Sequence, residues 1–317
     1  MRTLWFASTW GRCWAAALGA LLVVHALAGA VAAQEGDPGE RAQPPIEDPR
    51  ESRGPGLPAY WVRPLRQTIP LSAPPDRPVE APDPFRIGRL RAPIWEQVFY
   101  SVERDLRSDE GRILPRQWVQ IKGVSGQWGT SDVLVLDALQ RQADFWVRVL
   151  PEAWYDGSAW RYAGTYRGYL VSNVRGAPPL QVEIRIDRLA RVELSALEFS
   201  IVAHSGVGVY EASDPVVVTL RANHSAWKLS RAFLAPLRQG PGESDRIPLS
   251  QVRISENGGP FEPVPETPQV WLSGADLAEP RLVKRELRLQ VEVTWEELEG
   301  RYKGAMQLTL DYPSGAQ

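Results

Sequence analysis

The stretches Gly164-Thr-Tyr166-Arg-Gly168 and Gly300-Arg-Tyr302-Lys-Gly304 share the pattern G-x-Y-x-G, with a basic residue before the second glycine. The first glycine lets the chain turn with positive φ before a strand begins. A tyrosine two residues later can bury its ring and return its hydroxyl to a nearby backbone group, as in the tyrosine corner of Greek-key sandwiches. The second glycine would lie in the strand, where backbone or an aromatic ring comes close. The pattern predicts the final strand of a β-sandwich. A plain hairpin turn with a core tyrosine is the alternative, and it implies the same fold class.

Further matching segments precede the two stretches in the same order. The first half carries Arg112-Ile113 with Pro115 and then Trp118-Val-Gln-Ile121, and the second half carries Arg246-Ile247-Pro248 and then Val252-Arg-Ile254. Leu90-Arg-Ala92 ahead of Trp95 likewise matches Leu220-Arg-Ala222 ahead of Trp227. Landmarks that recur in one order at nearly constant spacing indicate an internal repeat.

From Phe85 onward the chain consists mostly of short apolar runs with a period of two. Every second residue is apolar from Leu287 to Trp295, which is typical of a strand with one buried face. The β-branched run at 215–220 indicates a central strand. Segments with a helical spacing are scarce. The best is 95–106, so one short helix is expected there, in competition with the repeat. Short strands with Gly/Pro turns predict an all-β fold of two tandem Greek-key sandwiches, immunoglobulin-like or pilin-like.

The amino-terminal residues differ in composition from the rest. Residues 1–33 combine early arginines, an apolar run and a small-residue ending, which predicts a cleaved signal peptide. An uncleaved membrane anchor is the alternative. Residues 34–58 are rich in proline, glycine and charge and predict a disordered linker. We expect the first β-sandwich domain at 59–178, its repeat at 179–317, and an exported protein in the periplasm, at the cell surface or outside the cell.

The sequence offers little for catalysis or metal binding. The one cysteine, Cys13, lies in the predicted leader, so the exported chain has no disulfide, thiolate ligand or cysteine nucleophile. His204 and His224 stand among turn residues without the spacing of a zinc site. There is no phosphate loop, dinucleotide fingerprint or basic-aromatic patch, and the formal net charge is −2. We expect no enzyme, no cofactor, no metal and no nucleic-acid partner.

Tryptophan is the residue type that points to a ligand. Indole rings stack on the apolar faces of sugars. Several aromatic residues stand beside Gly, Asp and Ser in loop-like sequence of the first half and form the candidate glycan site: Trp128, Trp154, Tyr155, Trp160 and Tyr162. The alternative is that these side chains cap the end of the sandwich.

The segment from Gly300 to Tyr312, together with Val216 to Trp227, resembles secreted bacterial pilin-type sandwiches, the spore-coat-U and related cell-surface families. This resemblance implies a surface-exposed β-sandwich rather than a particular activity. Coat-U subunits usually carry a disulfide, which this chain lacks, so the resemblance gives no expectation of chaperone–usher assembly.

Three functions follow from these features. The first is a structural or adhesive module of the cell envelope, with other envelope proteins or cell-wall glycan as partners and a membrane only if the leader is uncleaved. The second is a carbohydrate-binding module that uses the loop tryptophans. The third is self-assembly in which the apolar patch at Thr68–Leu71 adds a strand to a neighbour's sheet.

Overall fold

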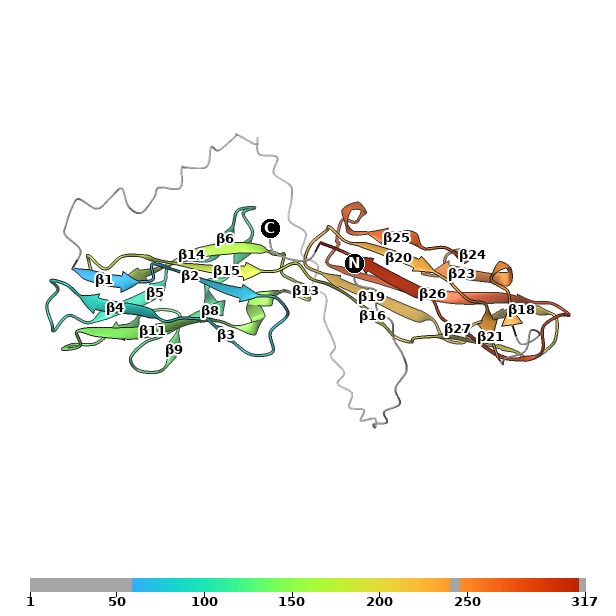
Figure 1. Cartoon of the computed structure of the whole chain (residues 1–317), viewed down its shortest axis with the longest axis horizontal. Coiled ribbons are helices and arrows are strands. Elements are labelled where there is room, and N and C mark those ends of the chain that lie inside the picture. The colour runs from blue at the N-terminus through green and yellow to red at the C-terminus, as the bar shows by residue number, and fades with distance from the viewer. Residues whose placement is uncertain (1–58, 240–245, 314–317) are drawn as a thin grey trace, which may run out of the picture. The chain divides into compact units, whose positions relative to one another are not determined.

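The structure, a computed structural model, describes residues 59–239 and 246–313, and these residues form β-strands joined by turns and four short 3-10 helices (Figure 1). The predicted signal peptide and linker, residues 1–58, lie outside the described residues. In the described part of the chain, no helix is long and apolar enough to cross a membrane. The all-β fold class is confirmed.

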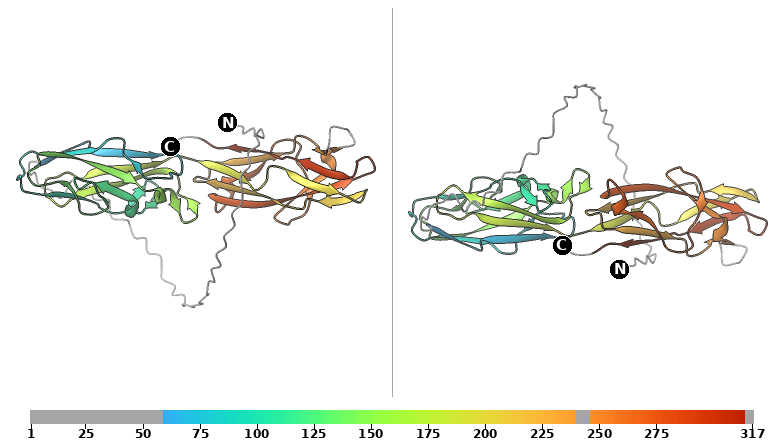
Figure 2. Two further views of the ribbon diagram at one scale, coloured as in Figure 1. Left: turned by 90° about the horizontal axis from the view of Figure 1, so that it is seen from below. Right: turned by 90° about the horizontal axis from the view of Figure 1, so that it is seen from above.

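Two sheets form the first sandwich, and Figure 2 shows its two layers. One sheet has the order β1-β4-β11-β8-β9, with β3 also paired to β11. Its strands are β1 (Tyr60–Arg63), β3 (Val79–Glu80), β4 (Phe85–Arg89), β8 (Val119–Lys122), β9 (Trp128–Gly129) and β11 (Gln142–Val149). The other sheet has the order β10-β5-β14-β15-β2, with β6 on β14 and β7 on β6. Its strands are β2 (Arg66–Leu71), β5 (Val98–Val102), β6 (Leu106–Ser108), β7 (Ile113–Leu114), β10 (Val133–Leu136), β14 (Gly164–Ser172) and β15 (Leu180–Ile186).

The second sandwich repeats this pairing scheme. One sheet has the order β16-β19-β26-β23-β24, with β18 also paired to β26. Its strands are β16 (Ala190–Leu194), β18 (Gly208–Glu211), β19 (Val216–Ala222), β23 (Val252–Glu256), β24 (Glu262–Pro263) and β26 (Leu282–Val293). The facing layer is divided into β25-β20-β28 and β17-β27-β21-β22. Its strands are β17 (Phe199–Ala203), β20 (Lys228–Ala232), β21 (Leu237–Arg238), β22 (Arg246–Ile247), β25 (Gln269–Ser273), β27 (Gly300–Gly304) and β28 (Gln307–Asp311).

Short elements complete the two sandwiches. They are the 3-10 helices η1 (Arg116–Trp118), η2 (Pro151–Trp154), η3 (Leu249–Gln251) and η4 (Gly274–Asp276), and the hairpin of β12 (Tyr155–Asp156) and β13 (Ala159–Trp160). In each sandwich a two-residue strand, a 3-10 turn and a longer strand follow one another: β7, η1 and β8 in the first, and β22, η3 and β23 in the second. These are the segments in which the sequence comparison found matching landmarks.

Each sandwich encloses its own hydrophobic core. The first core includes Phe85, Phe145 and Tyr100, whose rings stack with centroids 5.3 and 5.5 Å apart. The second core includes Phe199, Phe233 and Trp227. The apolar side chains of β15 belong to the first core. The expected boundary between residues 178 and 179 therefore falls one strand too early, because β15 pairs with β14 along its whole length.

The helix expected at 95–106 is not formed. Residues 98–102 are strand β5, in which Val98, Tyr100 and Val102 are buried at a period of two. A spacing of four residues is close to one helical turn and is also two periods of a strand, so the sequence pattern was ambiguous. The matched tryptophans differ as well. Trp227 is buried and donates to the Pro280 carbonyl (3.1 Å), whereas Trp95 is 73% exposed in a loop.

Candidate functional site

The two G-x-Y-x-G segments form the corners that begin β14 and β27. Neither is the final strand that the pattern predicted, because β15 follows β14 and β28 follows β27. Tyr166 and Tyr302 are fully buried. The Tyr166 hydroxyl donates to the Tyr162 carbonyl (2.8 Å), and the Tyr302 hydroxyl donates to the Leu298 carbonyl, in both cases four residues upstream. Burial raises the pKa of Tyr166 to about 12. Each corner therefore fixes the start of a strand through one buried hydroxyl.

The second glycine of each pattern lies against a leucine of the neighbouring strand. A Cβ at Gly168 would lie 2.6 Å from the Leu106 side chain, and one at Gly304 would lie 2.7 Å from the Leu237 side chain. Both distances are shorter than any ordinary contact, so β6 and β21 can approach only because these positions have no side chain.

The five aromatic residues of the candidate glycan site do not form one exposed platform. Trp154 is fully buried and Trp160 is 5% exposed, and their rings meet edge to face with centroids 6.3 Å apart. Tyr155 is exposed on the β12–β13 hairpin, and Tyr162 lies under the Arg112 guanidinium at 4.0 Å. Because a buried indole cannot present its face to a sugar, Trp154 and Trp160 act as packing residues.

Trp128 is placed differently. It lies on β9 with the Arg148 guanidinium 4.1 Å and the Lys122 ammonium 5.0 Å from its ring centroid. These cations lie over the indole ring, where they compete with a stacked sugar for its π-surface.

The two histidines are also separate from any cluster of ligands. His204 is exposed, with Nδ1 3.3 Å from the Val202 carbonyl. His224 is buried, and neither ring nitrogen has a hydrogen-bond partner. Desolvation, with a smaller effect of the Arg188 charge, lowers the pKa of His224 to about 4. Within residues 59–239 and 246–313, no three His, Cys, Asp or Glu side chains are grouped so as to hold a metal ion.

The clearest difference between the sandwiches lies beside the strand that carries the tyrosine. In the first sandwich β15 pairs antiparallel with β14, and Gly164, Tyr166 and Gly168 lie opposite Ile186, Ile184 and Val182. Strand β2 then pairs parallel with β15 on its far side.

In the second sandwich β17 occupies the corresponding place. Gly300, Tyr302 and Gly304 lie opposite Ala203, Ile201 and Phe199, which is the same register. In chain order, β2 is the second strand of the first sandwich and β17 is the second strand of the second sandwich. In the second sandwich the counterpart of β2, β17, therefore pairs directly with β27, the strand that carries Tyr302. No described strand of the second sandwich takes the position of β15.

This missing strand leaves part of the second core uncovered. Strand β17 begins at Phe199, opposite Gly304, so among the described strands β28 pairs with β20 alone and is an edge of its sheet. Leu308 and Leu310 on β28 pack against the second core but remain partly exposed. Leu170, which follows the equivalent glycine in the first sandwich, is fully buried, and its strand β14 is paired there on both sides, with β15 and with β5.

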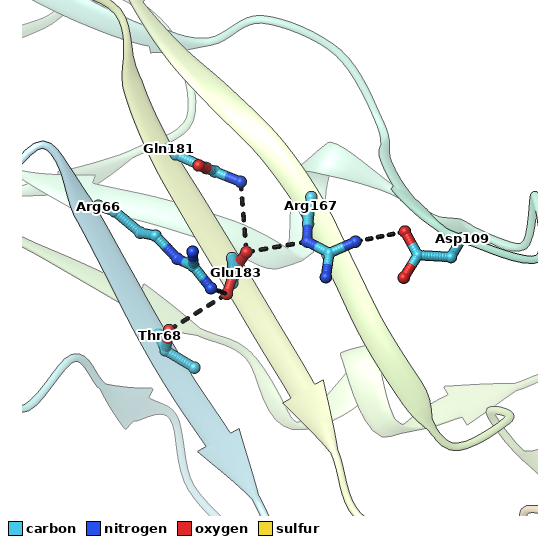
Figure 3. A network of polar contacts seen from close by, with 6 residues as sticks. All are labelled: Arg66, Thr68, Asp109, Arg167, Gln181 and Glu183. Carbon is cyan, nitrogen blue, oxygen red and sulfur yellow. Dashed lines mark hydrogen bonds and ion pairs between the residues drawn. The ribbon is translucent and has the colours of Figure 1, made fainter. Parts of the chain in front are cut away.

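In the first sandwich β15 is also held by a buried carboxylate. Figure 3 shows Glu183 of β15 between Arg66 of β2 and Arg167 of β14. Glu183 is 2% exposed; Arg167 Nε donates to it at 2.9 Å, and Thr68 and Gln181 also donate. Arg167 also pairs with Asp109.

The equivalent basic residue of the second sandwich, Lys303, instead pairs at the surface with Glu198 (2.6 Å). Among the residues described, the second sandwich therefore has no buried ion pair at the position where Glu183 pairs with Arg167 in the first.

The Thr68–Leu71 patch does not supply a strand to a neighbour in this structure. It is the end of β2, and it is already paired with β15 of its own chain. Ile69 and Leu71 are buried in the first core. The sequence correctly identified strand-forming residues here, but not that their partner is in the same chain.

The fold and the site define a protein of two tandem β-sandwiches. In the second sandwich the apolar strand β28 is an edge strand, with one partner among the residues described. The sequence matches no protein-family profile and no curated protein.

Solved structures give distant likenesses. One is the CsuC–CsuE chaperone–tip adhesion subunit pre-assembly complex from Acinetobacter baumannii, with 9% identity, 78% of this chain and 98% of that chain covered, and a TM-score of 0.44. Another is CfaE, the adhesive subunit of CFA/I fimbria of enterotoxigenic Escherichia coli, with 10% identity, 78% and 95% coverage, and a TM-score of 0.33. These values are too low to bear on function, so the sheets themselves carry the argument.

Proposed function

We propose that this protein is a non-enzymatic, exported component of the cell envelope with a structural or adhesive role, and that it assembles by accepting a β-strand from a partner protein. The observation that carries the proposal is the vacant strand position of the second sandwich. The chain itself supplies a strand, β15, at the corresponding position of the first sandwich, and the register beside the two tyrosines is the same.

The geometry specifies how such a strand binds. It pairs antiparallel with β28, as β15 pairs with β14, and its alternate apolar side chains cover Leu308 and Leu310. Where it continues past β28 it displaces β17 from β27 and pairs parallel with β17, as β15 pairs with β2. Backbone hydrogen bonds supply the affinity in this kind of recognition, and pockets for alternate side chains supply the specificity.

A peptide of the chain's own β15 sequence tests the strand-acceptor part. The peptide of residues 178–188 carries the alternation of Leu180, Val182, Ile184 and Ile186. Added in excess to the full protein, it is expected to raise the thermal midpoint of the second sandwich and to slow amide exchange in β28. The matched control has Val182→Asp and Ile184→Asp, which place charges on the face that enters the core.

The same segment can also be fused after residue 317 through a Gly/Ser linker. The fusion raises the effective concentration of the segment, so its binding is detected even if the free peptide binds weakly. If neither the peptide nor the fusion stabilises the second sandwich, the acceptor proposal is wrong. Cell fractionation tests the envelope location independently, and a native protein confined to the cytoplasm would contradict it.

A further inference from the structure

Two hydrogen-bonded loops at one end of the first sandwich carry four strongly exposed apolar side chains. The loop 90–97 joins β4 to β5, and the loop 137–141 joins β10 to β11. The Leu139 amide donates to the Ile94 carbonyl (2.6 Å), so the loops lie together. The exposed fractions are 56% for Leu90, 53% for Ile94, 73% for Trp95 and 75% for Leu139. Isolated exposed apolar residues are ordinary, but a group on adjoining loops marks an interaction site.

The loops are held in this arrangement by the head group of Arg89, a half-buried residue at the end of β4. Arg89 donates from Nη1 to the Pro93 carbonyl (2.7 Å), from Nη2 to the carbonyls of Glu96 (2.6 Å) and Asp137 (3.0 Å), and from Nε to the Gln140 carbonyl (2.8 Å). One side chain therefore fixes the backbone of both loops. The apolar residues are presented on a rigid support, which lowers the entropy lost on binding.

At Leu139 the exposure of an apolar side chain is favoured over the local stability of the backbone. Its φ of +65° is in the left-handed region, which costs a non-glycine residue free energy. Its side chain is three-quarters exposed, so no burial offsets that strain. A glycine or asparagine would fit this backbone better, and a leucine here contributes only an apolar group directed into solvent.

The acidic side chains of the two loops are hydrogen-bonded within the protein, whereas two of their arginines are exposed. Glu96 accepts a hydrogen bond from the Tyr60 hydroxyl, and Asp137 accepts from Gln97 Nε2 (2.7 Å) and from the Ala138 amide (2.7 Å), so both carboxylates are engaged within the protein. Arg91 and Arg141 are exposed, and neither forms an ion pair with any described residue. The positive groups that flank the apolar residues are thus the ones free to meet a partner.

From these features we propose that the loops 90–97 and 137–141 insert into the surface of an anionic lipid membrane. Tryptophan prefers the depth of the lipid headgroups, and leucine and isoleucine enter the acyl boundary. Arginine keeps its stem near the apolar region while its head group meets lipid phosphate. Apolar side chains that project from two adjoining loops suit a deformable lipid surface, which adapts to each of them.

The test is co-sedimentation of the full protein with vesicles of phosphatidylcholine alone and of phosphatidylcholine mixed equally with phosphatidylglycerol. Binding is expected on the anionic vesicles and is expected to weaken with salt. Trp95 fluorescence is expected to be quenched by brominated acyl chains. The variant with Ile94→Ser, Trp95→Ser and Leu139→Gly is expected to lose at least about tenfold in affinity. Leu139→Gly relieves the backbone strain, so this variant is expected to remain folded.

Two further variants separate the contributions. Trp295→Ser removes an indole that is 91% exposed but lies in the second sandwich beside Glu296 and Glu297, and it is expected to leave vesicle binding unchanged. Arg91→Gln with Arg141→Gln is expected to reduce the salt dependence. Absence of binding to anionic vesicles, or equal binding by the triple variant, overturns the proposal; equal binding to both vesicle types overturns the role of the arginines.

Discussion

At the scale of single residues, a position without a side chain determines how closely two strands approach. Gly304 faces Leu237, and Gly168 faces Leu106, at distances that leave no room for a Cβ. We expect Gly304→Ala to destabilise the second sandwich by about 1–3 kcal/mol, because Leu237 or the backbone of β21 must move. Urea unfolding measures the loss. Gly208→Ala is the matched control, since a Cβ there meets only the Tyr210 ring at 3.7 Å. Equal effects of the two substitutions would contradict the explanation.

His224 gives the protein a specific dependence on pH. Its pKa is lowered to about 4 in the folded state by burial and by Arg188, while the ordinary value is near 6.5. Below pH 6.5 the unfolded chain binds a proton that the folded chain resists. Stability is therefore complete above about pH 6.5 and falls by about 2–3 kcal/mol as the pH is lowered toward 4.

Urea unfolding at a series of pH values checks this expectation. His224→Gln is expected to remove this part of the decline, whereas His204→Gln, at an exposed position, leaves it in place. An unchanged pH profile in His224→Gln would show that other groups cause the loss.

Among the aromatic residues, the sequence predicted the role of the corner tyrosines but not the burial of Trp154 and Trp160. The G-x-Y-x-G pattern correctly predicted both corner tyrosines. The turn requires glycine and the corner requires a tyrosine two residues later, so local sequence is sufficient to find them. Trp154 and Trp160 stand beside polar turn residues, and this suggested exposure. Both are buried because η2 and the β12–β13 hairpin fold them together, a tertiary arrangement that local composition does not encode.

At the scale of elements, the first sandwich depends on a strand held by ionic contacts across three strands. Glu183→Ala is expected to destabilise it by about 2 kcal/mol, because the substitution removes the partner that Arg66, Thr68, Arg167 and Gln181 share. The loss is moderated since Arg66 and Arg167 can reach water. Glu198→Ala, which breaks the exposed pair with Lys303, is expected to cost well under 1 kcal/mol. Thermal unfolding of both variants checks the contrast, and equal losses would contradict it.

Periodicity predicted the elements better than it predicted their partners. Apolar residues alternate with polar ones at 182–186 and at 306–312, which is the period of a strand, and these segments correspond to β15 and β28. Nothing in those residues shows that β15 completes the first sheet while β28 lies at an edge, since pairing is decided by segments far apart in the chain. The strand β5 was obscured for a simpler reason, because Val98 and Val102 satisfy both a helical and a strand spacing.

At the scale of the whole molecule, the two sandwiches share much of one pairing scheme, and among the described strands only the first sandwich fills the position of β15. The complete first sandwich buries the apolar side chains of β15, whereas the second leaves those of β28 partly exposed. If strand uptake is the function of the second sandwich, its stability is expected to depend on a partner. The first sandwich does not share that dependence.

The position of β15 leads to a prediction about independent folding. A fragment of residues 57–188 contains every strand of the first core and is expected to unfold in one cooperative transition. A fragment of residues 57–178 ends at the boundary that the sequence suggested. It loses the four buried apolar side chains of β15, and it leaves β2 without β15, with which β2 pairs in the described part of the chain. That shorter fragment is expected to lack a cooperative transition in urea and to exchange its amides rapidly. If it unfolded at the same urea concentration as the longer fragment, β15 would be dispensable to the first core, and the comparison that identifies a vacant strand position in the second sandwich would lose its basis.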